Sequence, residues 1–334
     1  MGSEADRPSR GRSLVSDYLV MRLYLGIDGG QSSTTALIGD ETGRVLGTGT
    51  AGPSNHAAAG QGRRKFIAAI TDSLTQAAAS AGLSETAFEA ACLGLSGGPA
   101  DKETLTRETI RAKRYQITHD AHIALAGATG GQPGIVVIAG TGSMAFGRNA
   151  AGVTARAGGW GYIFGDEGGA FDLVRQALRA ILRNEEGWGP PTALREALLD
   201  AVLEKGAGGA RNAHQLLHRL YTDEYPRDRV AGWAALVDRA ARAGDAVARD
   251  ILGSAAQALA TMTAAVRRQL FEKSGQVDIC YCGGVFGSIP LLERFRMLVE
   301  LEEGNRVSAP RHSPAEGALL EAYRMCGVSP ERLR

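Results

Sequence analysis

The stretch that decides the fold is YLGIDGGQSSTTALI, residues 24–38. It consists of an apolar strand, an acidic residue, two glycines, a run of hydroxyl residues and a second apolar strand. Glycines let the backbone of a hairpin turn approach a bulky anion and adopt positive φ. Hydroxyls and exposed N–H groups bind phosphate oxygens, and the Asp28 carboxylate can hold a hydrated Mg²⁺. The stretch therefore predicts a phosphate-binding hairpin.

A second element of the same kind is IVVIAGTGS, residues 135–143. Strand, phosphate-type turn, strand, turn and strand thus occur twice, which we interpret as a degenerate internal duplication. Two such hairpins predict two related half-molecules that hold one nucleotide. Further along, Pro99 is suited to the start of a helix. The apolar run 277–282 predicts a late strand that ends in a glycine-rich turn.

The pattern predicts an α/β fold of two lobes, with glycine-rich turns at strand ends that face a shared cleft. Residues 1–20 are polar, and we expect them to be a flexible leader. Residues 21–130 are expected to form the N-terminal lobe, which a helix at 315–334 completes. Residues 131–314 are expected to form the C-terminal lobe, with a helical insertion at 167–272.

Composition narrows the class of protein. Of the 334 residues, 44% are hydrophobic, which is enough for a substantial core. Lys and Arg (37) nearly balance Asp and Glu (36), which argues against a nucleic-acid-binding or strongly basic membrane-binding surface. Four cysteines at irregular spacing predict no disulfide framework and favour a reducing cytoplasm. No uninterrupted apolar run approaches about 18 residues, so we expect no transmembrane helix.

Several separated motifs, taken in order, resemble those of a known family. They are Gly26–Thr35, Pro53–His56, Gly94–Gly98, Thr118–Ala121, Gly140–Ser143, Gly158–Gly161, Gly165–Gly168, Cys282–Val285 and Ser313–Ala318. The chain resembles the BadF-type ATPases, the branch of the sugar-kinase/actin/Hsp70 superfamily that contains the N-acetylglucosamine kinases. The resemblance covers residues from about 22 to about 325 and implies a two-lobed, actin-like (ribonuclease H-like) ATPase fold with duplicated mixed-sheet domains.

The resemblance implies that ATP and Mg²⁺ are the cofactors and that Asp28 orients the metal. It implies a nucleotide site made of Gly29, Gly30, Gln31, Ser32, Ser33, Thr141, Gly142, Ser143, Gly283 and Gly284. Gln31 departs from the family, which has a third glycine at this position of the first loop. Its side chain either crowds the phosphates or supplies an amide donor.

The resemblance also implies that Asp120 is the catalytic base. It implies a substrate site made of Asn55, His56, Ser96, Gly97, Trp160, Gly161, Asp166 and Glu167. Without the resemblance, Asp28 ahead of two glycines is typical of a turn, and Asp120 before an alanine-rich helix is typical of an N-cap. For Ser96 the alternative is a turn role, and for Asn55 and His56 it is a place in a surface loop. For Trp160 the alternative is simple packing, and for Asp166 and Glu167 it is capping of the following helix.

The implied activity is ATP-dependent phosphorylation of the 6-hydroxyl of an amino sugar, with N-acetylglucosamine as acceptor. We expect a homodimer in the cytoplasm that binds small molecules. Glucosamine or another hexosamine or muramic-type sugar is an alternative acceptor. A more distant alternative is an ATPase activator of an iron–sulfur dehydratase or reductase. That role needs thiolates at a subunit boundary, whereas Cys280 and Cys282 lie in a predicted strand.

Overall fold

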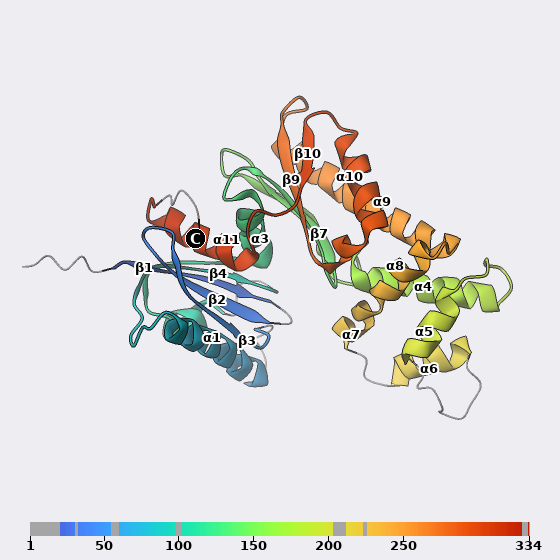
Figure 1. Cartoon of the computed structure of the whole chain (residues 1–334), viewed down its shortest axis with the longest axis horizontal. Coiled ribbons are helices and arrows are strands. Elements are labelled where there is room, and N and C mark those ends of the chain that lie inside the picture. The colour runs from blue at the N-terminus through green and yellow to red at the C-terminus, as the bar shows by residue number, and fades with distance from the viewer. Residues whose placement is uncertain are drawn as a thin grey trace, which may run out of the picture.

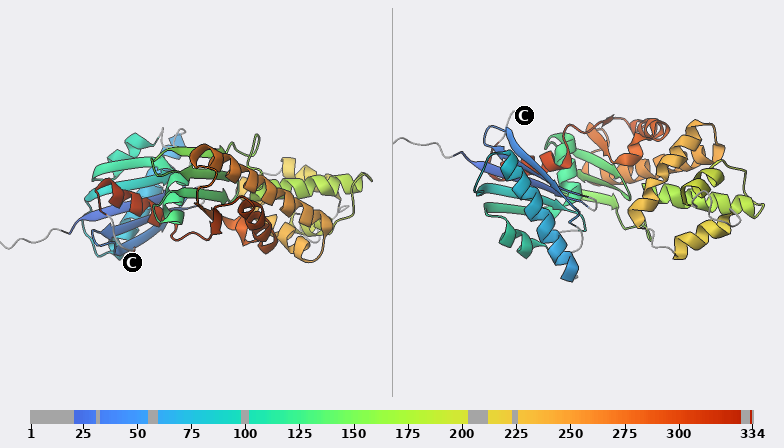
Figure 2. Two further views of the ribbon diagram at one scale, coloured as in Figure 1. Left: turned by 90° about the horizontal axis from the view of Figure 1, so that it is seen from above. Right: turned by 60° about the horizontal axis from the view of Figure 1, so that its bottom comes forward.

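The computed structural model describes residues 21–30, 33–54, 60–97, 102–202, 212–222, 226–328 and 333. Figure 1 shows two β-sheets side by side and a group of helices beyond the second sheet. Two further views show the same succession along the long axis of the molecule (Figure 2). In the described part of the chain, no helix combines the length and apolarity needed to cross a membrane.

The first sheet has the strand order β3-β2-β1-β4-β5. Its strands are β1 (Leu23–Gly29), β2 (Thr34–Asp40), β3 (Val45–Ala51), β4 (Phe88–Leu95) and β5 (Ala112–His119). The β1–β2 and β2–β3 pairs are antiparallel, whereas β1–β4 and β4–β5 are parallel. Neighbouring residues of β1 alternate between two cores. Leu25 packs with Phe66 of α1 (Gly60–Ser80), and Tyr24 packs with Leu319 of α11 (Pro314–Met325).

The second sheet repeats this topology with the order β10-β9-β6-β7-β8. Its strands are β6 (Gly134–Ala139), β7 (Ser143–Arg148), β8 (Thr154–Gly158), β9 (Val277–Cys282) and β10 (Asn305–Ser308). The β6–β7 and β7–β8 pairs are antiparallel, and β6–β9 and β9–β10 are parallel. Both sheets therefore have the same order and the same strand directions. This topology confirms the α/β fold with duplicated mixed sheets.

Helices account for most of the remaining described chain. They are α2 (Glu103–Thr109), α3 (Asp120–Thr129), α4 (Ala170–Glu185), α5 (Leu194–Val202), α6 (Ala213–Thr222), α7 (Arg227–Gly232), α8 (Ala234–Arg242), α9 (Ala246–Leu270) and α10 (Ile289–Glu300), with the 3₁₀ helix η1 (Gly284–Gly287). Helices α4 to α9 lie within the predicted helical stretch 167–272. Helix α9 packs on β6, β7 and β8 and belongs to the core of the second sheet.

Helix α3 lies between the two sheets. It contacts β4 and β5 of the first sheet, β6, β7 and β9 of the second, and α11. Ala121, Ala124 and Gly127 are small enough to let these elements approach closely. Gly26 plays the same part on β1, because a Cβ there would collide with the backbone of Leu319. The division of the chain at residue 130 remains a prediction, since α3 packs on both halves.

One helix prediction is wrong in its starting point. Helix α2 begins at Glu103, and its N-cap position is Lys102 rather than a residue near Pro99. Pro99 itself lies outside the described residues. The buried Lys102 ammonium donates a hydrogen bond to the Ser96 carbonyl over 2.6 Å. This bond joins the start of α2 to the turn that follows β4.

A buried ion pair joins β7 to α11. Arg148 donates to Glu321 over 2.8 Å, and the side chains are only 6% and 5% exposed. Arg148 also donates to the Gly131 carbonyl over 3.1 Å, and His122 of α3 lies 3.9 Å from Glu321. Burial raises the pKa of Glu321, but the nearby His122 ring and the Arg148 guanidinium outweigh it and hold the pKa at about 2. The pair connects the second sheet to a helix of the first.

We predict that Glu321→Gln lowers the free energy of unfolding by about 3–5 kcal/mol, because Arg148 is left buried without a counter-charge. The Glu321 pKa lies below its ordinary value of 4.5, so its contribution is complete above that pH. The contribution is lost as the pH falls toward about 2. Urea unfolding between pH 7 and pH 3 measures the difference between the two proteins.

Glu89→Gln is the matched control, since Glu89 pairs with Lys113 on the surface, where Lys113 is 71% exposed. We expect a change within about 1 kcal/mol for this variant. Equal effects of the two substitutions would contradict a stabilising role for the buried pair.

Candidate active site

A cleft of about 1020 Å³ lies between the two sheets. Its walls come from the strand ends of the first sheet, the start of α3, the β6–β7 turn, β8 and the segment before α4. The predicted site residues that line it are Ser96, Gly97, Asp120, Thr141, Gly142, Ser143, Gly161 and Asp166. Residues that are far apart in the sequence are therefore gathered around one cavity.

The acidic end of the cleft follows from strand direction, with Asp120 lining the cavity and Asp28 close to Asp120 but not itself among the lining residues. β1, β4 and β5 are parallel neighbours, so their carboxyl ends meet at one edge of the sheet. Asp28 lies next to last in β1, Ser96 follows β4 directly, and Asp120 follows β5 directly. The order of strands thus brings two carboxylates and a hydroxyl together.

Asp120 is held by a short hydrogen bond. Ser96 Oγ donates to Asp120 Oδ2 over 2.6 Å, and the backbone N–H of Ala121 lies 2.8 Å from Oδ1. The N-cap position of α3 belongs to His119, and Asp120 is the first helical residue. A negative charge in the first turn is favoured by the helix dipole. The carboxylate is therefore oriented by Ser96 and faces the cleft instead of capping the helix.

Asp28 is sensitive to the Asp120 charge. Burial and the nearby Asp120 carboxylate raise the pKa of Asp28 to about 6. The same two carboxylates add to the burial that raises the pKa of Cys282, at the end of β9, to about 12. The second sheet therefore contributes a protonated thiol close to the acidic end.

The first predicted phosphate loop is described in part. Gly30 N–H donates to the Ser33 carbonyl over 2.9 Å, which closes the turn between β1 and β2. The Gly29 carbonyl accepts from the Ser96 N–H over 2.9 Å. Gln31 and Ser32 lie outside the described residues, as do Asn55 and His56. Their predicted contacts remain predictions.

The second loop, Gly140–Ser143, is supported from below by α4. The N–H groups of Ala170 and Phe171 donate to the carbonyls of Gly140 and Thr141 over 2.8 and 3.2 Å. Ser143 Oγ donates to the Glu167 carbonyl over 2.6 Å, so this hydroxyl is engaged within the protein. The backbone of the loop is therefore held in place independently of any ligand.

Asp166 lies under this loop. It is buried, has a positive φ of 62°, and forms an ion pair with Arg227 at the start of α7. Its carboxylate lies so close to Gly142 that a Cβ there would be 2.5 Å from Asp166 Oδ2. A non-glycine residue with positive φ is uncommon and occurs where the surroundings hold it. Asp166 thus shapes the loop, and its sugar contact remains a prediction.

The other predicted residues lie beside the cleft. Gly161 lines the cleft. Trp160 is 66% exposed, and the Arg156 guanidinium lies over its ring, 4.6 Å from the centroid. Trp160 therefore packs against Arg156 on the surface, and its contact with the sugar remains a prediction. Glu167 is exposed. Gly283 and Gly284 follow β9, next to the end of β6 from which the second loop starts.

Sequence reasoning missed two arginines that line the cleft. Arg227 comes from the helical region and carries no motif, so nothing in the sequence indicates its pairing with Asp166. Arg156 lies opposite Phe146 in the β7–β8 pair, and residues directly opposite share a face of the sheet. Arg156 falls in the last strand of the second predicted repeat, and the alternation of side chains along that strand is the sequence signal that could have indicated it.

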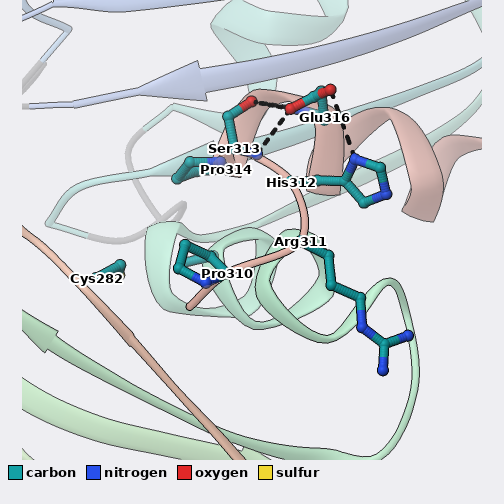
Figure 3. Close-up of a pocket in the computed structure, with 8 residues that line it drawn as sticks. Cys282, Pro310, Arg311, His312, Ser313, Pro314 and Glu316 are labelled. Atoms are coloured by element: carbon teal, nitrogen blue, oxygen red, sulfur yellow. Dashed lines mark hydrogen bonds and ion pairs between the residues drawn. The ribbon is translucent and has the colours of Figure 1, made fainter. Parts of the chain in front are cut away.

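A second cavity, of about 270 Å³, lies where the chain returns from β10 to α11 (Figure 3). The N–H groups of Arg311 and His312 donate to the α3 carbonyls of Ala128 and Gly127, both over 3.1 Å. Ser313 and Glu316 then form a capping box at the start of α11, and the His312 side chain points toward Glu316. The polar groups of this cavity therefore serve to cap α11 and to join the chain before it to α3.

The sequence and the fold both resemble those of known proteins. Residues 25–322 match the model of the BadF/BadG/BcrA/BcrD ATPase family. An N-acetylmuramic acid/N-acetylglucosamine kinase of Clostridium acetobutylicum is 30% identical over 313 residues, covering 92% of this chain and all of the relative. An N-acetyl-D-glucosamine kinase of Dictyostelium discoideum is 29% identical over 78% of this chain and 85% of its own length.

A crystal structure from Chromobacterium violaceum, described as a candidate N-acetylglucosamine kinase, superposes with a TM-score of 0.73 at 29% identity. The superposed region covers 90% of this chain and 98% of the Chromobacterium violaceum chain. A glucokinase of the ROK family from Streptomyces griseus, solved with glucose and AMPPNP, has a TM-score of 0.52 at 18% identity and shares the fold.

We predict that Gly142→Ala lowers the free energy of unfolding by about 1–3 kcal/mol, because the added methyl group meets the Asp166 carboxylate, which Arg227 holds in place. Urea denaturation measures the change. Gly140→Ala is the matched variant in the same loop, since a Cβ at Gly140 meets no atom within 4 Å. Equal stability of the two variants would show that Asp166 does not constrain the loop.

Proposed function

The chain belongs to the BadF/BadG/BcrA/BcrD ATPase family, and we propose that it is an ATP-dependent kinase that phosphorylates the 6-hydroxyl of an amino sugar, N-acetylglucosamine. The products are N-acetylglucosamine 6-phosphate and ADP. The observation that carries the proposal is the Asp120 carboxylate, oriented by Ser96 in a cleft whose other wall is the second glycine-hydroxyl loop.

Asp120 acts as the general base of this reaction. The sugar oxygen attacks the γ-phosphorus, the bond to the β-phosphate oxygen breaks, and the hydroxyl proton passes to Asp120 Oδ. Phosphoryl transfer needs positioning and charge neutralisation more than covalent catalysis. Ser96 contributes to the positioning, since its hydrogen bond keeps the carboxylate in one orientation. The backbone of Gly140–Ser143 is held by α4 and offers a rigid cradle for phosphate oxygens.

The residues of the acidic end fit a Mg²⁺ ion that arrives with the nucleotide. Mg²⁺ is usually bound by one or two carboxylates together with substrate phosphates. Asp28 supplies such a carboxylate, and among the described residues no three His, Cys, Asp or Glu side chains form a metal cage. Asp28 would hold the ion, which neutralises phosphate charge when bound.

The same site bears on two alternatives, another amino-sugar acceptor and an iron–sulfur activator. Glucosamine remains an alternative acceptor within the same site. The iron–sulfur activator finds no support, because Cys280 and Cys282 both lie in strand β9, where Cys280 is buried and donates to the Ala128 carbonyl over 3.3 Å. A homodimer and a cytoplasmic location are part of the proposal, and light scattering of the purified protein tests the dimer.

We predict that Asp120→Asn lowers turnover about 10²–10⁴-fold, because the amide cannot accept the hydroxyl proton, while the affinity for ATP stays within about threefold. A coupled assay of ADP release with N-acetylglucosamine measures turnover, and calorimetry measures nucleotide binding. Asp278→Asn is the control carboxylate, since Asp278 lies 3.7 Å from Arg311 and does not line the cleft. A variant of Asp120 with undiminished turnover would remove it from the mechanism.

We predict that the affinity for Mg²⁺·ATP falls as the pH is lowered through about 6, because protonated Asp28 cannot bind the metal. The raised pKa means that metal binding releases a proton from Asp28 in this range. Asp28→Asn should bind more weakly and lack this part of the pH dependence.

Calorimetry between pH 5 and pH 8 on both proteins isolates the effect, because protonation of the nucleotide is common to both titrations and cancels in the difference. Parallel pH profiles of the two proteins would contradict a metal role for Asp28.

A further inference from the structure

The cleft extends beyond the acidic end along one face of the β7–β8 pair. Met144 and Phe146 of β7 line it, together with Thr154 and Arg156 of β8. Phe146 and Arg156 are directly opposed, so their side chains leave the sheet on the same face. At about 1020 Å³ the cavity is at the upper end of ordinary ligand sites, which span about 300–1,000 Å³. The acceptor end therefore has room for a substituted sugar.

Arg156 is a cation without an acidic partner among the described residues. The other charged groups in the cleft differ, because Asp166 is paired with Arg227 and Asp120 accepts from Ser96. Arg156 instead rests on the exposed ring of Trp160, 4.6 Å from its centroid. Stacking holds the guanidinium by its face and leaves its N–H edges free to donate.

We propose that Arg156 determines acceptor specificity by binding a carboxylate on the amino sugar. This inference rests on the proposed sugar kinase function. It adds to the N-acetylglucosamine of the proposed function a second acceptor that the site prefers, an N-acetylated hexosamine with an acidic substituent, as in the 3-O-lactyl ether of N-acetylmuramic acid. Guanidinium groups bind carboxylates in a planar, two-pronged geometry. The Clostridium acetobutylicum relative is named for both the acidic and the neutral sugar.

A nucleotide phosphate is the other anion that could meet Arg156. The two glycine-hydroxyl turns lie at the ends of β1 and β6, whereas Arg156 lies in the edge strand β8, beside the loop of Trp160. The placement favours the acceptor. The experiment separates the two ligands, because a phosphate contact would weaken ATP binding for every sugar alike.

The test compares Arg156→Met, Arg156→Lys and Arg156→Glu with the unmodified protein. The coupled assay gives kcat/KM for N-acetylmuramic acid, N-acetylglucosamine and glucosamine at saturating Mg²⁺·ATP. We expect the ratio of acidic to neutral sugar to fall about 10- to 100-fold in Arg156→Met, as for loss of a hydrogen bond to a charged group. Arg156→Lys should recover part of the ratio, and Arg156→Glu should shift preference toward glucosamine, which carries an ammonium.

Two further measurements sharpen the test. The ratio in the unmodified protein should fall as ionic strength rises, because salt screens an exposed charge pair. Trp160→Ala should lower the ratio in the same direction, since it removes the surface on which Arg156 rests. Arg294→Met on α10, an exposed arginine that does not line the cleft, should leave the ratio at its original value.

The inference is overturned if the protein phosphorylates N-acetylglucosamine but not N-acetylmuramic acid, or if Arg156→Met changes both sugars equally. Absence of turnover with all three sugars would instead overturn the proposed function. Calorimetric binding of N-acetylmuramic acid tests the inference even then, because its affinity should drop in Arg156→Met whether or not phosphate is transferred. Unchanged affinity in that variant would overturn it.

Discussion

The structure depends on the close packing of α3 between two sheets of the same topology. Small residues make this possible, because Gly127 and its neighbours let the chain return from β10 within hydrogen-bonding distance of the helix. The same helix begins at Asp120, so the element that joins the two halves also carries the proposed base. A change in the packing of α3 would therefore move the carboxylate relative to the second loop. Helix α3 therefore both holds the two sheets together and positions the proposed base.

The four carboxylates around this junction are held in four different environments. Glu321 is buried against Arg148, which keeps it ionised, and Asp28 is buried against another acid, which raises its pKa to about 6. Asp120 accepts from a hydroxyl, and Asp166 is paired with an arginine of a distant helix. Burial raises the pKa of both Asp28 and Glu321, and their neighbours decide the outcome, because Asp120 raises the pKa of Asp28 further whereas His122 and Arg148 lower that of Glu321. The neighbours of each carboxylate therefore differ between the ion-paired Glu321 and Asp166 and the proposed site residues Asp28 and Asp120.

The sequence predicted the parts of the site that depend on strand ends. Asp28, Ser96 and Asp120 were singled out through the resemblance and lie at or just after the ends of predicted strands. The structure brings them together because β1, β4 and β5 are parallel neighbours that end at one edge. The duplication was visible because glycine-rich turns follow apolar runs in both halves. The start of α2 was misplaced because a proline that suits a helix start does not require one there. The sequence did not reveal the ion pair of Asp166, because its partner Arg227 comes from a helix with no distinguishing motif.

By itself, the sequence determined the α/β class and the duplicated pattern of strands and turns, because these follow from hydrophobic periodicity and from local turn chemistry. The residues of the proposed site came from the resemblance to a family. Only the tertiary structure decided which charges are paired. The ion pairs of Arg148 with Glu321 and of Arg227 with Asp166 depend on elements that the chain brings together by packing. Side-chain contacts of this kind arise from distances between elements, and periodicity within an element carries no information about them.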